Sequence, residues 1–392
     1  MPPAAGTAPA LELLIRSESG DGYTVCHYAS HEGGLRYRPC LVPPEQYEVN
    51  CIAVADGEPP VYLVRSLETG AIVQLSAAAH GVFRGMDGRA SLLDLVTTLF
   101  VSTGALSPAE VRQTVTELQR AGLLVTRPQR HLRASPWRRA AATLGIPGAN
   151  RGIAALYRCA APVLFSAWAP WFALVIVALG VFANAALPWR STATALRTHW
   201  EVGAAATAVV LGLVLPAHEL AHAFVCRRFG RRVKALGVRL LWGVLPVPYA
   251  DVTEVWMASR RARARVYLAG PLSTLVFGSA MALAAWLIPP SPVRAIAHAS
   301  ATASLALAAA TLCPFLGYAS DGYYVLASHW GSPSLRQDAL RLVARALSRR
   351  VRQKGFSPHE RRLLVFAAAT LGCLSAMVGC AVWGCLARVS GP

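Results

Sequence analysis

The sequence predicts a mainly α-helical, polytopic membrane protein of about five spans, with an N-terminal α+β, winged-helix-like cytosolic domain. Hydrophobic residues make up 54% of the 392 residues and charged residues only 15%, whereas soluble domains carry about 25% charged residues. The charge is also uneven. Residues 1–126 hold eight Arg and 13 Asp or Glu, a net charge of −5, so the remaining residues carry +23 to give the total of +18. An acidic front argues against a nucleic-acid partner, and a basic, hydrophobic remainder favours the lipid bilayer.

The membrane-spanning segments are predicted from length and hydrophobicity. A transmembrane helix needs about 20 mostly apolar residues. A soluble helical core is the alternative, but it would show a polar stripe of helical period, which the first and last stretches lack. Glu219 is the only formal charge inside the five stretches, which are residues 161–187, 202–225, 266–288, 295–318 and 363–387.

The orientation follows from the basic residues between the spans. Residues 127–160 carry seven Arg, residues 227–265 nine Arg and one Lys, and residues 319–362 eight Arg and one Lys. The connection between the first and second spans carries only two Arg, and the one between the third and fourth spans carries one. Cytoplasmic loops collect Lys and Arg. We therefore expect a multi-pass protein of the cell (plasma) membrane, with its N-terminal domain in the cytosol and its C-terminus outside.

These patterns divide the chain into six segments. The segment before the last span is basic and amphipathic, so we expect it to lie on an anionic cytosolic leaflet. The segments are 1–45, a tail with extra strands; 46–126, a winged-helix-like domain; 127–160, an Arg-rich juxtamembrane linker; 161–330, a membrane core; 331–362, the amphipathic segment; and 363–392, the last transmembrane helix and C-terminus.

The N-terminal domain shows strand patterns followed by helix patterns. Thr69 and Gly70 form a turn between two of the expected strands, and Ser76, Ser91 and Ser107 stand where helices should begin. We expect strands at 47–54, 61–67 and 71–75, and helices at 77–86, 92–101 and 108–121.

Two stretches of this domain, "YLVRSLETGAIVQLSAAAHGVF" and "LSPAEVRQTVTELQRAGLLV", carry a resemblance. Residues 46–126 resemble the peptide-recognition element of ribosomal natural-product pathways, typified by the pyrroloquinoline quinone chaperone. The resemblance implies that a leader peptide is bound as an added strand at the sheet edge. A purely structural winged helix and a DNA-binding one are the alternatives, and the net negative charge disfavours the second.

The second expected span contains the motif His218-Glu219-Leu220-Ala221-His222. Residues i and i+4 share a helix face, so the two imidazoles are placed to bind one Zn²⁺ with Glu219 beside them as general base. An ionisable residue inside a span is costly and marks function by default. Two buried core histidines with a snorkelling Glu219 are the alternative.

Catalytic zinc takes three protein ligands and leaves a fourth position open. The candidates for the third ligand are Asp321, Asp251, His298 and His329. The spans at 202–225 and 295–318 run in the same direction, which brings HExxH and Asp321 to one depth and leaves His298 at the opposite face. We therefore favour Asp321, keep Asp251 and His329 open, and note that Asp251 is also placed to hydrogen-bond a ligand imidazole.

The stretches "LPAHELAHAFVCRRFGRRV", "LPVPYADVTEVW", "LAGPLSTL" and "CPFLGYASDGYYVL" resemble the site-2-protease-type membrane zinc metallopeptidases. The "DGYY" variant resembles the subgroup found beside peptide-antibiotic genes. The resemblance implies that His218, His222 and Asp321 are metal ligands and that Glu219 is general base and acid.

Three positions depart from the family pattern. Thr274, Thr311 and Cys313 stand where the family often has asparagine. Those asparagines are thought to bind substrate or oxyanion, so the donor is open here: Thr311, Thr274 or a backbone N–H are the candidates.

Residues 240–252 form an apolar loop with Pro246 and Pro248. One interpretation is a loop that enters the membrane and offers an edge strand to hold a substrate extended; the other is an ordinary loop packed on helices.

The preferred function is a membrane-embedded zinc metalloendopeptidase. It would bind a ribosomally made precursor peptide through its leader and hydrolyse one peptide bond to mature it. An intramembrane protease of a membrane-bound regulator is the second hypothesis. The third is a non-catalytic immunity or transport partner with a vestigial zinc site.

Overall fold

The computed structural model describes residues 11–16, 23–28, 37–54, 59–104, 107–125, 143–145, 149–241, 245–316, 320–347 and 356–389. By internal contacts the chain divides into two compact units. The first comprises residues 1–53 and 59–131, and the second comprises residues 54–58 and 132–392.

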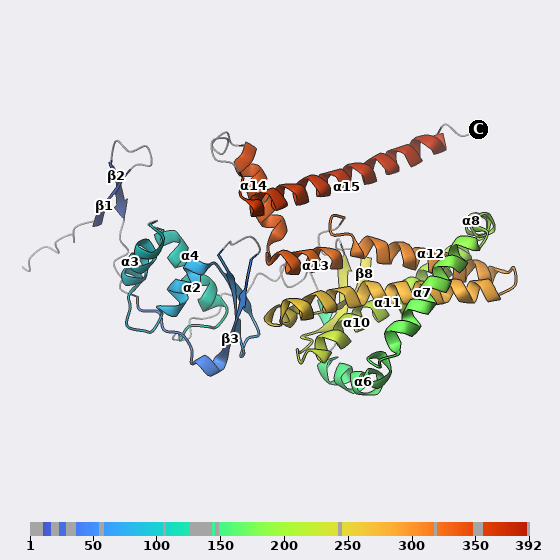
Figure 1. Cartoon of the computed structure of the whole chain (residues 1–392), viewed down its shortest axis with the longest axis horizontal. Helices are drawn as coiled ribbons and strands as arrows, with labels where there is room; N and C mark the ends of the chain where they lie inside the picture. The colour runs from blue at the N-terminus through green and yellow to red at the C-terminus, as the bar shows by residue number, and fades with distance from the viewer. Residues whose placement is uncertain are drawn as a thin grey trace, which may run out of the picture. The chain divides into compact units, whose positions relative to one another are not determined.

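The first unit is a three-stranded antiparallel sheet followed by three helices (Figure 1). Its elements match the expected ones to within two residues. The sheet has the order β3 (Tyr47–Ile52), β4 (Val61–Ser66), β5 (Ile72–Leu75), after the short helix η1 (Pro44–Gln46). The helices are α2 (Ala77–Arg84), α3 (Leu92–Thr103) and α4 (Pro108–Arg120), and β1 (Leu11–Arg16) pairs with β2 (Tyr23–Tyr28) in a separate hairpin.

Local capping starts the first two helices where the sequence predicts. The Ser76 hydroxyl accepts the N–H of Ala79, and Ser91 and Asp94 form a capping box. Ser107 makes no such side-chain bond, and α4 begins instead with Pro108 at its first turn. The apolar faces of sheet and helices then close one core, in which Val64, Leu99 and Leu118 are buried.

The second unit is built mainly of helices around α11 (Arg260–Leu287). This helix contacts α7 (Ala169–Ala186), α10 (Leu215–Arg228), α12 (Pro292–Leu312) and α13 (Asp321–Trp330) (Figure 1). Gly180 of α7 lets the backbone of Ser279 approach closely, since an added Cβ would overlap it. The remaining elements are α6 (Ala149–Leu164), α8 (Trp189–Thr198), α9 (Trp200–Val209), η3 (Val210–Val214), η4 (Thr253–Met257), α14 (Leu335–Leu347) and α15 (Pro358–Val389), with strands β6 (Thr143–Gly145), β7 (Leu236–Leu241) and β8 (Leu245–Ala250).

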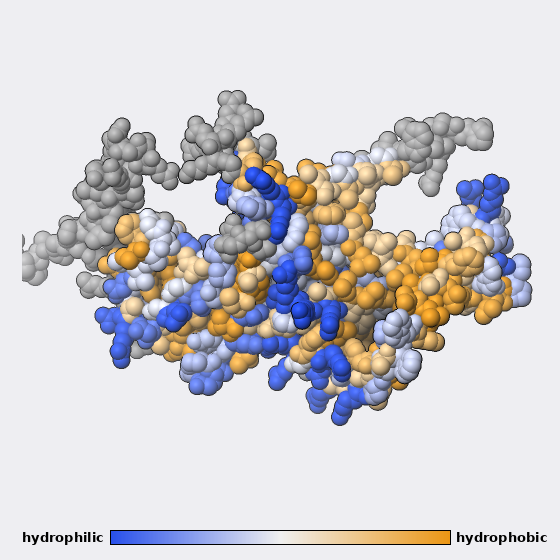
Figure 2. Space-filling view, viewed as in Figure 1, coloured by the Kyte–Doolittle hydropathy of each residue, from blue (hydrophilic) through white to orange (hydrophobic). Residues whose placement is uncertain are grey.

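In the described part of the chain, four helices are long and apolar enough to cross a membrane: α7, the continuous helix Trp200–Arg228, α11 and α12. A fifth is counted only if α3 and α4, bent by 120°, are taken as one span; both instead bury apolar side chains in the core of the first unit. Figure 2 shows a hydrophobic band over α7 and α12 and a hydrophilic surface at α8. The fold fits a polytopic helical membrane protein. The fifth expected span, 363–387, lies within α15, which is not among these four.

The first expected span is wrong at its beginning. The helix is interrupted between Leu164 and Ala169, where the Ser166 hydroxyl accepts the N–H of Ala169 and opens a new helix. Residues 149–164 form α6, so the end of the expected linker is a structured helix. Its Ile153 is buried in a cluster with Phe224, and that packing stabilises it against α10.

The amphipathic segment also differs from the expectation. Leu335 and Leu342 of α14 are fully buried in a cluster with Tyr323 of α13 and Phe366 of α15. The apolar face of α14 therefore packs on protein, whereas the sequence predicts that it lies on lipid. Leu340, on another face, remains 63% exposed.

Candidate metal centre

Two histidines of α10 form the base of the site. His218 and His222 stand one helical turn apart, and both are only 5% exposed. Their Nε2 atoms lie 3.1 Å from each other. The i, i+4 spacing thus brings the two ring nitrogens to one point.

Asp321, in the first turn of α13, brings its carboxylate to the same two ring nitrogens. Its Oδ2 lies 3.1 Å from His218 Nε2, and its Oδ1 lies 3.2 Å from His222 Nε2. Gly322 lets α13 begin against the end of α12, because a Cβ there would overlap the Leu312 carbonyl. The structure therefore brings together the three side chains that the sequence selects as metal ligands.

Both imidazoles are oriented through their other nitrogen by α11. His218 Nδ1 lies 2.8 Å from Thr274 Oγ1, and His222 Nδ1 lies 2.7 Å from the Val266 carbonyl oxygen. Such partners fix the ring orientation of metal-ligating histidines. The proposed role of Asp251 as an imidazole partner is contradicted, because its carboxylate accepts the N–H of Thr253 at 3.0 Å and both Nδ1 atoms have other partners.

Gly270 of α11 is a contributor that the sequence argument missed. A Cβ at this position would overlap His222 Nε2 and lie 2.6 Å from His218 Nε2. The missing side chain leaves the space in front of the two ring nitrogens. The stretch "LAGPLSTL" contains this glycine, but only the helix contact shows what it does.

The three groups fit a zinc ion. Zn–N bonds of about 2.0–2.1 Å in a tetrahedral site place neighbouring ligand atoms about 3.3 Å apart. The three separations of 3.1, 3.1 and 3.2 Å are close to this value. Two imidazoles and one carboxylate are also a donor set of catalytic zinc, which keeps the fourth position open.

Glu219 is held beside the cluster by the hairpin that follows α10. Its Oε2 accepts the N–H of Ala250 at 2.8 Å. Ala250 ends β8, the outer strand of a sheet with the order β6-β7-β8. The structure thus shows β strands in the 240–252 stretch, with β8 contacting α10, whereas residues 242–244 lie outside the described residues.

The other sequence candidates lie elsewhere. His298 Nδ1 is 2.8 Å from Thr192 Oγ1, and His329 Nδ1 is 2.8 Å from Arg260 Nη2; neither joins the cluster. Thr311 Oγ1 donates to the Ala308 carbonyl of its own helix at 3.1 Å. Thr274, considered as an oxyanion donor, is bonded to the His218 ring instead.

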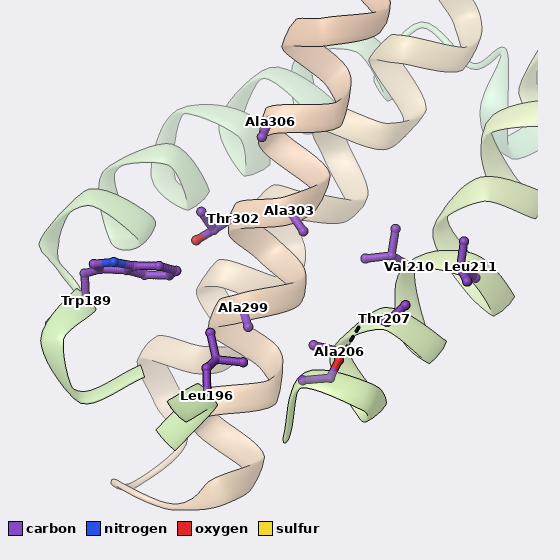
Figure 3. Close-up of a pocket in the computed structure, with 11 residues that line it drawn as sticks. Trp189, Leu196, Ala206, Thr207, Val210, Leu211, Ala299, Thr302, Ala303 and Ala306 are labelled. Carbon is purple, nitrogen blue, oxygen red and sulfur yellow. Dashed lines mark hydrogen bonds between the residues drawn. The ribbon is translucent and has the colours of Figure 1, made fainter. Parts of the chain in front are cut away.

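A cavity of about 460 Å³ lies between α8, α9, η3 and α12. Figure 3 shows Trp189 at one end and small side chains such as Ala303 along its wall. The hydroxyl of Thr207, also in the lining, donates to the backbone of its own helix. The described residues of the lining include no acid, base or metal ligand, whereas such groups meet in the His218, His222 and Asp321 cluster.

Comparison with known proteins supports this assignment. Residues 206–365 match the family model of peptidase family M50. This stretch is an M50 peptidase domain. It contains the HExxH helix and Asp321, so this domain is a site-2-type metallopeptidase that hydrolyses peptide bonds, and peptidases of this family are generally zinc-dependent. Searches of curated proteins and of solved structures gave no match. The first unit lies outside the M50 match.

Proposed function

We propose that this chain is a membrane-embedded endopeptidase that matures a ribosomally made precursor peptide, which its first unit binds through the leader. The observation that carries the proposal is that one chain joins the His218, His222 and Asp321 cluster to a second compact unit, whose end strand β3 pairs only with β4 among the described residues. The M50 domain supports the peptidase half. The resemblance of residues 46–126 supports the leader-binding half.

Glu219 supplies the proton transfers of peptide hydrolysis. The bond from Ala250 to Oε2 fixes the carboxylate and leaves Oε1 to accept the proton of the attacking water. The same carboxyl group then gives this proton to the leaving amine. Zinc, when bound by His218, His222 and Asp321, polarises the peptide carbonyl and lowers the pKa of the water. Thr274 and the Val266 carbonyl keep the imidazoles oriented throughout.

The first unit offers β3 to a leader peptide. The N–H of Leu67 donates to the Gln46 carbonyl, so Gln46 and the alternate residues after it face β4. Val49 and Cys51 therefore direct their backbone N–H and C=O groups away from β4. Within the described residues β3 pairs only with β4, and its outer edge has both donors and acceptors for an added strand.

Tethering explains why both units belong to one chain. A leader bound to the first unit converts the encounter of its core peptide with Glu219 into an intramolecular event, with an effective concentration of about 1 mM for short linkers. The protease site then needs little affinity of its own for the residues around the scissile bond.

Co-expression with a short precursor encoded next to the gene tests the proposal. The wild-type chain should cleave the leader, Glu219→Gln should not, and a chain without residues 1–126 should cleave the precursor poorly. An uncleaved leader with wild type and Glu219→Gln alike would defeat the proposal. Undiminished cleavage of a membrane-bound regulator by the truncated chain, without leader cleavage, would favour the second hypothesis.

A further inference from the structure

The helix that carries Asp321, α13, is joined to α11 at two places. Near the start of α13, the ring of Tyr324 stacks on the ring of Tyr267, with centroids 4.7 Å apart and planes 17° apart. Near its end, His329 Nδ1 lies 2.8 Å from Arg260 Nη2. The partners follow one another in opposite directions along the two helices, so α11 and α13 pack antiparallel and are in contact near both ends of α13.

The tyrosine stack lies next to both kinds of ligand. Tyr324 follows Asp321 by three residues, so the two side chains lie on the same face of α13. Tyr267 directly follows Val266, whose carbonyl oxygen lies 2.7 Å from His222 Nδ1. The Tyr267 ring also meets the His222 ring edge to face, with centroids 6.5 Å apart. The stack therefore joins the helix turn that orients an imidazole to the helix turn that carries the carboxylate.

A third ring packs against the stack. The ring centroid of Trp256, in η4, lies 6.3 Å from that of Tyr267 and 6.5 Å from that of Tyr324. Tyr267 is buried, with 6% of its surface exposed. The adjacent Tyr323 has a different neighbour, because its ring packs on Phe366 of α15 at 6.1 Å. The two consecutive tyrosines thus attach α13 to two different helices, and Tyr324 makes the contact with α11 that lies beside the metal centre.

We infer that Tyr267 and Tyr324 are positioning residues that hold the Asp321 carboxylate against the two imidazoles. The inference rests on the peptidase half of the proposed function. Gly322 brings the start of α13 against α12, and the stack fixes the rotation of that start about the helix axis. This role differs from that of the Thr274 hydroxyl and the Val266 carbonyl, which orient the imidazoles, because the stack orients the third ligand.

The zinc affinity of the full-length chain, purified in detergent and measured by competition with a chelator, tests this role. Tyr324→Leu removes the stack, so we expect the Kd for zinc to rise about 3- to 10-fold, the range that one aromatic pair supplies. Tyr324→Phe keeps the ring and should stay within about twofold of wild type. If the leucine variant does not fold, Tyr324→Met fills the space without a planar ring and gives the same comparison.

Cobalt substitution distinguishes positioning of the ligand from a general loosening of α13. The visible absorption of bound Co²⁺ depends on the number and geometry of its ligands. We expect the bands of Tyr324→Leu to shift toward those of Asp321→Ala, and Tyr324→Phe to keep the wild-type spectrum. His329→Ala is the matched control. It removes the exposed contact with Arg260 at the other end of α13, eight residues from Asp321, and should leave zinc affinity and cobalt spectrum unchanged.

A double variant checks that the two tyrosines act as one pair. Tyr267→Leu combined with Tyr324→Leu should weaken zinc binding little more than either substitution alone, because each already removes the stack. Fully additive losses, or an unchanged Kd and spectrum in Tyr324→Leu, would overturn the inference and leave the peptidase function standing. Equal losses in Tyr324→Leu and His329→Ala would overturn it as well. A wild-type chain that binds no zinc would remove the function and the inference together.

Discussion

At the residue scale, the space in front of the two imidazoles depends on Gly270. A methyl group there overlaps the Nε2 atoms of His218 and His222. We expect Gly270→Ala to reduce bound zinc from about one atom per chain to near zero, measured by elemental analysis of the purified protein. Gly212→Ala is the matched control, since no heavy atom lies within 4 Å of its added Cβ. Full zinc content in the Gly270→Ala variant would contradict this role of Gly270.

Thr274 should affect zinc affinity through His218 alone. The hydroxyl is fully buried, and among the described residues its hydrogen-bond partner is the far nitrogen, Nδ1, of that ring. Thr274→Val keeps the shape and removes the partner, so we expect zinc affinity to fall about 10- to 100-fold. Thr274→Ser keeps the hydroxyl and should retain most of the affinity. Competition with a zinc chelator measures both; equal affinities of the two variants would exclude a positioning role.

The sequence predicts the parts of the site that share one helix or one consistent topology. His218, Glu219 and His222 follow from helical spacing, and the placement of Asp321 follows from the direction of two spans. The contacts of α11 with the two imidazoles could not be predicted. The partner of His222 is the backbone carbonyl of Val266, and every residue type carries such a carbonyl. For the same reason the sequence suggested Asp251 as an imidazole partner: its carboxylate has suitable chemistry, but it does not lie beside either ring.

At the element scale, α2 is joined to the sheet by a titratable ring. His80 stacks on Tyr62 of β4 with ring centroids 3.6 Å apart and planes 7° apart. Partial burial, and then the charge of Arg84, lower the pKa of His80 from its ordinary value of 6.5. The unfolded chain therefore binds this proton more readily than the folded chain does. The stability from this contact is complete above pH 6.5 and is lost as the pH falls through 6.5 toward the lowered folded pKa.

Amide hydrogen exchange of the first unit in the full chain should detect this loss. Protection of β3, β4 and β5 is expected to decrease from pH 7.5 to pH 5.5, after correction for the intrinsic exchange rate. His80→Phe keeps a stacked ring without the titration, so its protection should not change over this range. If the protection of the wild-type chain changed with pH no more than that of His80→Phe, the lowered pKa of His80 would be contradicted.

The elements of the second unit were harder to predict than those of the first. Strand and helix boundaries at 47–121 follow from serine caps and turn residues, which act locally. The break before Ala169 and the burial of Leu335 depend on neighbours distant in sequence. Hydrophobicity alone does not distinguish a side chain that faces lipid from one that faces α15, because both environments are apolar.

At the scale of the whole molecule, the charge distribution predicts the orientation in the membrane. Arg197 lies in α8, and Arg232 follows α10 at the other end of one predicted span; both side chains are exposed. We expect Arg197→Cys to react with a membrane-impermeant maleimide in intact cells. Arg232→Cys should react only after permeabilisation. The unmodified chain measures the background from native cysteines, and the reverse pattern would invert the orientation.

The last prediction concerns the coupling of the two units through the substrate. If the first unit acts by tethering, weakening the β3 edge should raise KM for a leader-bearing precursor by about 100-fold and leave kcat unchanged. Val49→Pro removes an outward N–H without touching the ladder to β4, and proline is tolerated at such an edge position. Val49→Ala keeps the N–H and is the control.

The leaderless core peptide separates tethering from damage to the active centre. Because the leaderless peptide does not bind β3, the Val49→Pro variant should cleave this peptide with the same kcat/KM as wild type. A fall in kcat for both substrates would instead mean that the substitution disturbs the peptidase domain. An unchanged KM for the full precursor would mean that the leader binds elsewhere, and the function of the first unit would have to be sought away from its sheet edge.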